Sequence, residues 1–123
     1  MAETPPPKAT ELARIVSAFR YSVDGLQATY QHEAAFRQEV IVAAVLIPLA
    51  LWLSVSVSSR LLMIASVALV LIVELLNSAI EAAVDRISPE KHELARRAKD
   101  AGSAAVLVAI ANAVVVWVLV LAG

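Results

Sequence analysis

The stretch that decides the fold is LLMIASVALVLIVELLNSAIEAAVDRI, residues 61–87, an apolar segment interrupted by a few polar side chains. The polar residues follow one another at intervals of three, four and four positions: Glu74, Asn77, Glu81 and Asp85. At about 100° per residue they fall within an arc of roughly 80° on a helix. A carboxylate at membrane depth costs on the order of 2.5–3.5 kcal/mol on insertion scales, so such residues usually face a protein interior. The segment therefore predicts a membrane helix that carries a polar functional site.

The composition also favours a membrane protein. Of the 123 residues, 60% are hydrophobic and 17% are charged, which is too apolar for an ordinary soluble domain of this length. The net charge is −1 and there is no basic stripe, so nothing indicates nucleic-acid binding. The absence of cysteine excludes disulfides, thiolate nucleophiles and cysteine-ligated metal.

Two further stretches are apolar enough to cross a bilayer, which takes about 20 residues. These are residues 40–59, which are all uncharged, and residues 104–122, where Asn112 is the only strongly polar side chain. A soluble helix would show a polar face and these do not, so a soluble three-helix bundle is the less favoured alternative. We expect an all-α membrane protein with a disordered N-terminus at 1–9 and a single membrane domain at 10–123. Within the domain we expect a surface helix and three membrane helices, at 10–30, 34–54, 60–86 and 89–122, the last with a cytoplasmic extension.

The basic residues predict the orientation. Nine of them precede the first span or lie between the second and third, and Arg60 alone lies on the other side. Positive residues favour the cytoplasmic side, so the N-terminus is expected in the cytoplasm and the C-terminus outside. Trp52 and Trp117 then fall near the outer interface. In the segment 10–30, apolar residues gather on one side, which is typical of a helix lying in the membrane interface.

The polar residues expected near the cytoplasmic side could form a phosphoryl-transfer site. Carboxylates suit Mg²⁺, cations balance the charge of a nucleotide, and a carboxylate can take a proton from an attacking hydroxyl. No glycine-rich nucleotide motif is present, so an ATP site would be built from side chains on helices. Simpler interpretations stand beside this one: Glu33 and Arg37 as a surface ion pair at i and i+4, and Asn112 as a helix–helix contact.

Three segments resemble the bacterial integral-membrane diacylglycerol kinases: HEAAFRQE at 32–39, VELLNSAIEAAVDRI at 73–87 and HELARRAKDAGSAAV at 92–106. The resemblance implies a homotrimer of three-span subunits in the bacterial inner membrane, each subunit with an N-terminal surface helix. It implies active sites between subunits at the cytoplasmic interface. The implied reaction moves the γ-phosphate of ATP to the hydroxyl of diacylglycerol, giving phosphatidic acid, with Mg²⁺ or Mn²⁺ as the metal.

The resemblance also implies roles for individual residues. Glu74 matches the catalytic base for the lipid hydroxyl, Asn77 matches the residue that orders this centre, and Glu33 and Glu81 match the metal ligands. The positions that match nucleotide contacts are Arg14, Tyr21, Glu33, Glu81, Glu90, Lys91, His92, Lys99 and Asp100. Those that match lipid contacts are Arg14, Ala35, Phe36, Arg37, Gln38, Glu39, Glu74, Ser103 and Trp117. The chain departs from the family pattern at Asp24, His32 and Lys91, which affects contacts with adenosine and the lipid headgroup.

Three alternatives remain at this level. Related proteins of similar architecture phosphorylate undecaprenol, although the segments EAAFRQE and AKDAGS favour the diacylglycerol branch. A small oligomer with a ring of intramembrane glutamates would also suit a cation channel or a proton-linked carrier. Arg14, Arg96 and Lys99 argue against that function, because a cation pathway has no need of them. A non-catalytic assembly subunit would explain neither the carboxylates nor their alignment.

Overall fold

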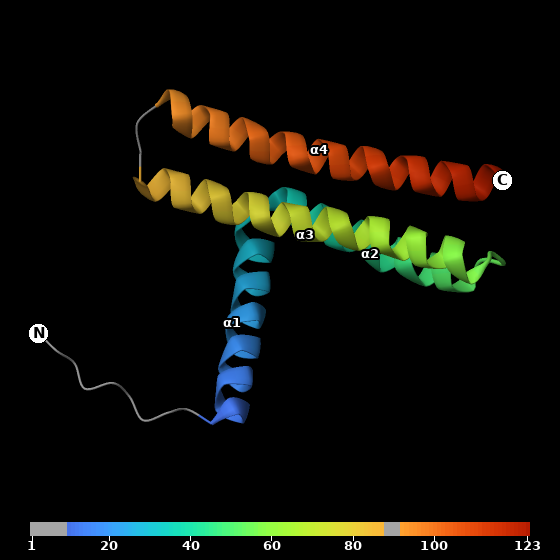
Figure 1. Cartoon of the computed structure of the whole chain (residues 1–123), viewed down its shortest axis with the longest axis horizontal. Helices are drawn as coiled ribbons and strands as arrows, with labels where there is room; N and C mark the ends of the chain where they lie inside the picture. Colours follow the sequence, from blue (N-terminus) through green and yellow to red (C-terminus); the bar gives the residue numbers. More distant parts are fainter. Residues whose placement is uncertain (1–9, 88–91) are drawn as a thin grey trace, which may run out of the picture.

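The computed structural model describes residues 10–87 and 92–123, and these form four α-helices. The helices are α1 (Glu11–His32), α2 (Ala34–Trp52), α3 (Val57–Ile87) and α4 (Glu93–Ala122). Figure 1 shows α2, α3 and α4 running side by side, with α1 standing across their direction. The predicted disordered segment 1–9 and the predicted helix start at Pro89 lie outside the described residues, as do Glu90 and Lys91.

Helices α2, α3 and α4 are each long and apolar enough to cross a membrane, with mean hydropathies of 1.8, 2.3 and 2.8 in their most apolar windows. Only 11–22% of the residues in those windows are buried within the chain. Most of the apolar surface therefore faces outward, where lipid or another subunit would cover it. The prediction of an all-helical chain with three potential membrane spans is confirmed.

The junction between α1 and α2 is a single extended residue, Glu33. The Arg37 guanidinium reaches back over this junction and donates to the carbonyl oxygens of Tyr30 (2.8 Å) and Gln31 (2.9 Å). These carbonyls belong to the last turn of α1, where the helix leaves them without internal partners. The predicted Glu33–Arg37 ion pair is not among the salt bridges of the described residues, because Arg37 caps α1 instead.

The connection between α2 and α3 comprises residues 53–56, so α3 starts earlier than the predicted position 60. Helix α3 already begins at Val57, and the Ser56 hydroxyl caps it by accepting from the Ser59 amide at 3.1 Å. Arg60 in the first turn of α3 donates to the carbonyls of Ala50 (3.2 Å), Leu51 and Val55 (3.2 Å). The one basic residue at this end of the bundle thus satisfies carbonyls at the end of α2, and fixes the turn.

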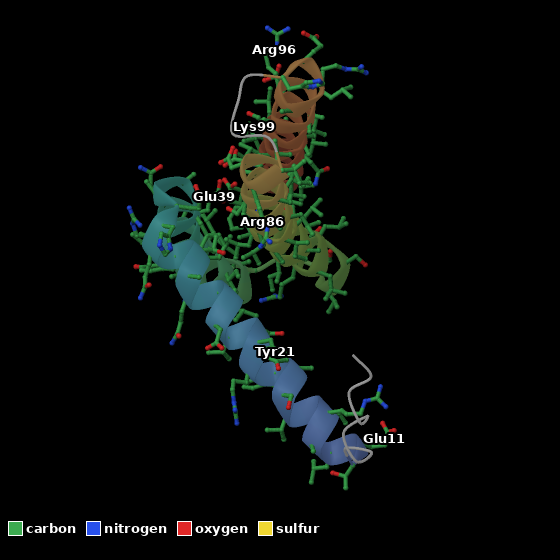
Figure 2. All side chains as sticks on the ribbon, turned by 90° about the vertical axis from the view of Figure 1, so that its left-hand side faces the viewer. Glu11, Tyr21, Glu39, Arg86, Arg96 and Lys99 are labelled. Carbon is green, nitrogen blue, oxygen red and sulfur yellow. The ribbon has the colours of Figure 1, made fainter. Side chains whose placement is uncertain are left out.

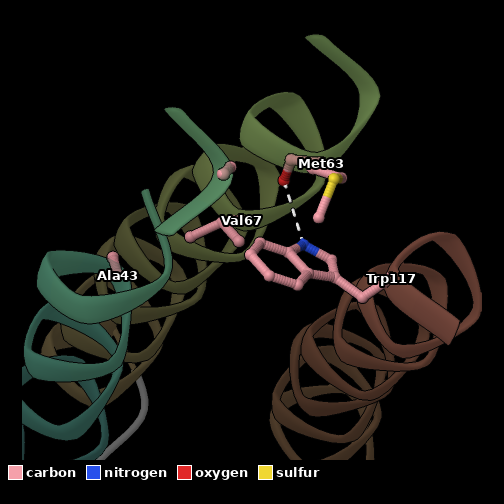
Figure 3. Packing of buried hydrophobic residues seen from close by; sticks show 5 residues of the cluster. Ala43, Met63, Val67 and Trp117 are labelled. Carbon is pink, nitrogen blue, oxygen red and sulfur yellow. Dashed lines mark hydrogen bonds between the residues drawn. The ribbon is translucent and has the colours of Figure 1, made fainter. Parts of the chain in front are cut away.

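The apolar core lies toward the same end of the bundle. Trp117 of α4 inserts its ring against α3 and donates from Nε1 to the Met63 carbonyl oxygen at 3.2 Å (Figure 3). Two alanines of α2, Ala43 and Ala50, are buried in the same cluster, and their small size lets α2 lie close to α3. The Trp117 side chain is only 9% exposed within this chain, and its N–H finds a partner in the core; its place near the outer membrane interface stays a prediction. Trp52, at 80% exposed, faces outward.

Candidate functional site

The buried face of α3 changes from apolar to polar along its length. Met63, Val67 and Val70 are followed on this face by Glu74 and Asn77. Glu74 is 5% exposed and Asn77 is 9% exposed. Burying a carboxylate is costly unless other groups stabilise it. The groups around Glu74 therefore indicate what stabilises its buried carboxylate.

Asn77 links two carboxylates on this face. Its Nδ2 donates to Glu74 Oε2 and to Glu81 Oε1, each at 3.4 Å. The predicted alignment of these three side chains is thus confirmed, and it follows from the helical repeat alone. The other amide atom, Asn77 Oδ1, is buried and has no hydrogen-bond partner among the described residues.

Helix α2 brings a further carboxyl group to Glu74. The side chain of Glu39 lies close to that of Glu74, and its Oε2 atom is buried with no hydrogen-bond partner among the described residues. Two ionised carboxylates at such a place repel each other, so the pair favours either a shared proton or a cation beside it. The sequence assigned Glu39 only as a lipid contact. Its meeting with Glu74 depends on how α2 packs on α3, which no motif spacing could reveal.

Past this pair, the ends of α3 and α4 are joined by an ion pair between Asp85 and Lys99. Lys99 lies in the charged first turns of α4, ahead of the apolar stretch that begins at Ala104. The hydrogen bond with Asp85 raises the pKa of the Lys99 ammonium above its usual value, so this group stays positively charged. The sequence placed Asp85 on the acidic face without giving it a role. Asp100 and Ser103 are both exposed on the same helix.

A cavity of about 560 Å³ opens between α2, α3 and α4. Its walls are mostly apolar, and it reaches from Trp117 to Gln38 and Glu39. Four of the residues predicted to contact lipid line it: Ala35, Gln38, Glu39 and Trp117. The cavity therefore runs from the core to the carboxyl group that faces Glu74.

Other predicted lipid contacts lie elsewhere. Phe36 is buried, Arg37 caps α1, and Ser103 is not part of the cavity wall. On α4, His92 forms the N-cap, its Nδ1 accepting from the Leu94 amide at 3.1 Å.

The predicted contacts on α1 stand away from the bundle in this chain. Tyr21 is 73% exposed, and Arg14 pairs with Glu11 at 3.4 Å on the helix surface. No residue of α1 is buried. In Figure 2, Tyr21 and Glu11 lie far along α1 from Glu39 and Lys99. A single chain does not bring these α1 residues to the carboxylates.

The predicted metal ligands, Glu33 and Glu81, share no hydrogen-bond partner in residues 10–87 and 92–123: Glu33 forms the junction of α1 with α2, and Glu81 accepts from Asn77 on α3. Nor does that part of the chain hold three acidic or histidine side chains grouped as for a metal ion. Mg²⁺ needs fewer protein ligands, because it usually binds one or two carboxylates together with substrate phosphates and water. Glu81, which accepts a hydrogen bond from Asn77, offers one carboxylate of the kind that such an ion binds.

Comparison with known proteins finds close relatives. The family described as prokaryotic diacylglycerol kinase matches residues 20–121. The chain is 54% identical over 112 residues to the diacylglycerol kinase of Escherichia coli K12, covering 91% of this chain and 92% of that protein. It is 52% identical over 123 residues to the diacylglycerol kinase of Pseudomonas aeruginosa, covering 100% of both. With the diacylglycerol kinase of Helicobacter pylori it shares 43% over 112 residues, which is 91% of this chain and 88% of the relative. The matched region contains Glu39, Glu74, Asn77 and Glu81.

Proposed function

Because the chain belongs to the prokaryotic diacylglycerol kinase family, we propose that it transfers the γ-phosphate of ATP to the free hydroxyl of diacylglycerol. The product is phosphatidic acid. The family prediction made from the three sequence motifs is confirmed. The observation that best supports the reaction in this chain is the buried Glu74 carboxylate, placed beside Glu39 at one end of an apolar cavity.

The cavity suits the lipid substrate. Its walls are apolar along α2, α3 and α4, and Gln38 and Glu39 stand at its polar end. An acyl chain would occupy the apolar part, and the hydroxyl that accepts phosphate would then lie near Glu39 and Glu74. There Glu74 takes the proton from the hydroxyl as phosphate transfer proceeds. This arrangement also disfavours the channel interpretation, because an ion needs polar groups along its path.

We assign the phosphate end of the site to the region of the Asp85–Lys99 ion pair, where the end of α3 meets the first turns of α4. Glu33 and Glu81 would hold Mg²⁺, or Mn²⁺, which neutralises negative charge on the phosphate oxygens when bound. Lys99 would lie against the phosphates, and Asp100, His92, Glu90 and Lys91 would contact the rest of the nucleotide. Arg14 and Tyr21 would cover the nucleotide and lipid entrance.

We further propose that the enzyme is a homotrimer in the bacterial inner membrane, with its active sites between subunits. Such an assembly would bring α1 of one subunit to the carboxylates of another, which a single chain does not do. The N-terminus and the α3–α4 connection would lie in the cytoplasm, where Mg-ATP is available, and the C-terminus in the periplasm. Nine of the ten basic residues then lie on the cytoplasmic side.

The test is transfer from γ-labelled Mg-ATP in mixed micelles, with diacylglycerol and undecaprenol offered separately. Labelled phosphatidic acid as the dominant product supports the proposal. Dominant labelling of undecaprenol would keep the chemistry but replace the lipid acceptor. No transfer to either lipid, from folded oligomer supplied with Mg²⁺, would contradict a lipid kinase and favour the transport alternative.

A further inference from the structure

Helix α4 passes closest to the Asn77 side chain at Gly102, which is buried. A Cβ atom added at this position would overlap Asn77 Oδ1 and lie 3.3 Å from Asn77 Cγ. All three of the nearest atoms that it would meet belong to the Asn77 side chain. The Asn77 side chain is therefore the nearest neighbour of the missing Cβ at Gly102.

That side chain has little freedom to move away. Its Nδ2 is shared between Glu74 and Glu81 at 3.4 Å to each, already long for a hydrogen bond. The amide group is planar, so a displacement of Oδ1 turns Nδ2 as well. If the amide were turned by 180°, Oδ1 would point at the Glu74 and Glu81 carboxylates. Because all three groups are hydrogen-bond acceptors, this orientation is unfavourable. A side chain at position 102 must consequently break or bend the bridge between Glu74 and Glu81.

We propose that Gly102 is a positioning residue for phosphate transfer, acting through Asn77. The missing Cβ leaves room for the Asn77 amide, which in turn holds the Glu74 and Glu81 carboxylates in a fixed relation. This inference rests on the proposed roles of Glu74 and Glu81. It goes beyond them by locating a determinant of the site on α4, in a residue that carries no functional group.

The first experiment is Gly102→Ala in the full chain, assayed in mixed micelles. We expect kcat to fall roughly tenfold or more, because small misplacements of catalytic groups are costly, with smaller changes in KM for ATP and lipid. The matched control is Gly25→Ala in α1, where no atom lies within 4 Å of the added Cβ. Both changes raise helix propensity equally, so an unchanged kcat in Gly25→Ala isolates the contact with Asn77.

The second experiment repeats Gly102→Ala in an Asn77→Ala background. If Gly102 acts through Asn77, its substitution changes kcat by less than about twofold once the amide is absent, since the two effects are coupled. An equal loss in both backgrounds would overturn the inference and indicate general packing. If Gly102→Ala fails to fold, recovery of the folded oligomer in the double variant supports the clash, and failure to recover contradicts it.

The same set of variants separates the inference from the proposed site. Asn77→Ala with wild-type kcat would show that Asn77 does not serve the reaction, which overturns the site assignment and the inference with it. A strong loss in Asn77→Ala, combined with no loss in Gly102→Ala, leaves the site standing and overturns the inference alone.

Discussion

At the scale of single residues, Glu74 has surroundings unlike those of any ordinary surface glutamate. It is 5% exposed on an apolar helix, accepts a hydrogen bond from Asn77, and faces the carboxyl group of Glu39. A carboxylate kept in such a place at a cost in stability is typical of a catalytic group. These surroundings predict how replacing Glu74 should change activity and stability.

Glu74→Gln is expected to lower kcat by about 10²–10⁴-fold, the usual contribution of a general base. Glutamine keeps the shape of the side chain but cannot take the proton, and it removes the charge next to Glu39, so the thermal midpoint should fall little or not at all. Labelled phosphate transfer and thermal unfolding in the same detergent measure the two effects. Glu93→Gln, at an exposed ion pair with Arg96, is the matched control and should retain full activity. Near-normal turnover in Glu74→Gln would contradict the assignment of the base.

At the scale of helices, side chains that donate to the backbone of a neighbouring helix or turn hold the bundle together. Arg37 closes the junction of α1 with α2, Arg60 closes the turn from α2 to α3, and Trp117 joins α4 to α3. Each donates to backbone carbonyl oxygens rather than to a carboxylate. Carbonyls at helix ends lack internal partners, so a long side chain with several donors stabilises them effectively.

Arg60→Ala is expected to lower the free energy of unfolding by about 1.5–3 kcal/mol, the range for hydrogen bonds made by charged groups. Arg60→Lys should restore little of the lost stability. A guanidinium has a planar, forked set of donors that reaches several carbonyls at once, and an ammonium lacks it. Denaturant titration of the detergent-solubilised protein measures the difference. Arg20→Ala, on the exposed surface of α1, is the control. A lysine variant as stable as the wild type would contradict the prediction, because it would show that the guanidinium geometry does not contribute to stability.

Trp117→Phe is expected to lower the free energy of unfolding by about 1 kcal/mol, since it keeps an aromatic ring but loses the hydrogen bond to Met63. Because Trp117 also lines the cavity, the KM for diacylglycerol should rise as well. Trp52→Phe provides the comparison, as that ring is 80% exposed and has no such role. Equal effects of the two substitutions would show that the buried N–H contributes nothing specific.

At the scale of the whole molecule, one chain assembles only part of the proposed site. Glu74, Asn77 and Glu81 are linked along α3, and α2 brings Glu39 beside Glu74. In contrast, no residue of α1 is buried, and Tyr21 stands far from the bundle (Figure 2). The outward faces of α2, α3 and α4 are apolar. A homotrimer would cover part of this surface and bring residues of different subunits together. This can be tested with oligomers that contain two different variants of the chain.

Mixed oligomers of Glu33→Gln and Glu74→Gln chains should recover measurable activity if these two residues of one active site come from different subunits. Some sites would then contain both glutamates, although each variant alone is inactive. The measurement is phosphate transfer after the two variants are unfolded together and refolded. The matched control mixes Glu74→Gln with Asn77→Ala, whose side chains are bonded within one helix and should not complement. No recovery in the first mixture would place Glu33 and Glu74 of each site in the same chain.

The sequence by itself determined the features that follow from short-range regularities. Runs of apolar residues predicted three helices able to span a membrane, because the length needed depends only on bilayer thickness and helical rise. The spacing of Glu74, Asn77 and Glu81 placed them on one face, because side-chain directions repeat every 3.6 residues. The three motifs identified the family.

Only the tertiary structure decided which side chains meet across helices. It brought Glu39 to Glu74, set Gly102 against Asn77, paired Asp85 with Lys99, and turned Trp117 into the core. It also directed Arg37 to backbone carbonyls and away from the neighbouring Glu33. These contacts depend on the rotation and offset of one helix against another, which arise from the packing of all their side chains together. A helical repeat fixes directions within one helix and carries no information about that offset.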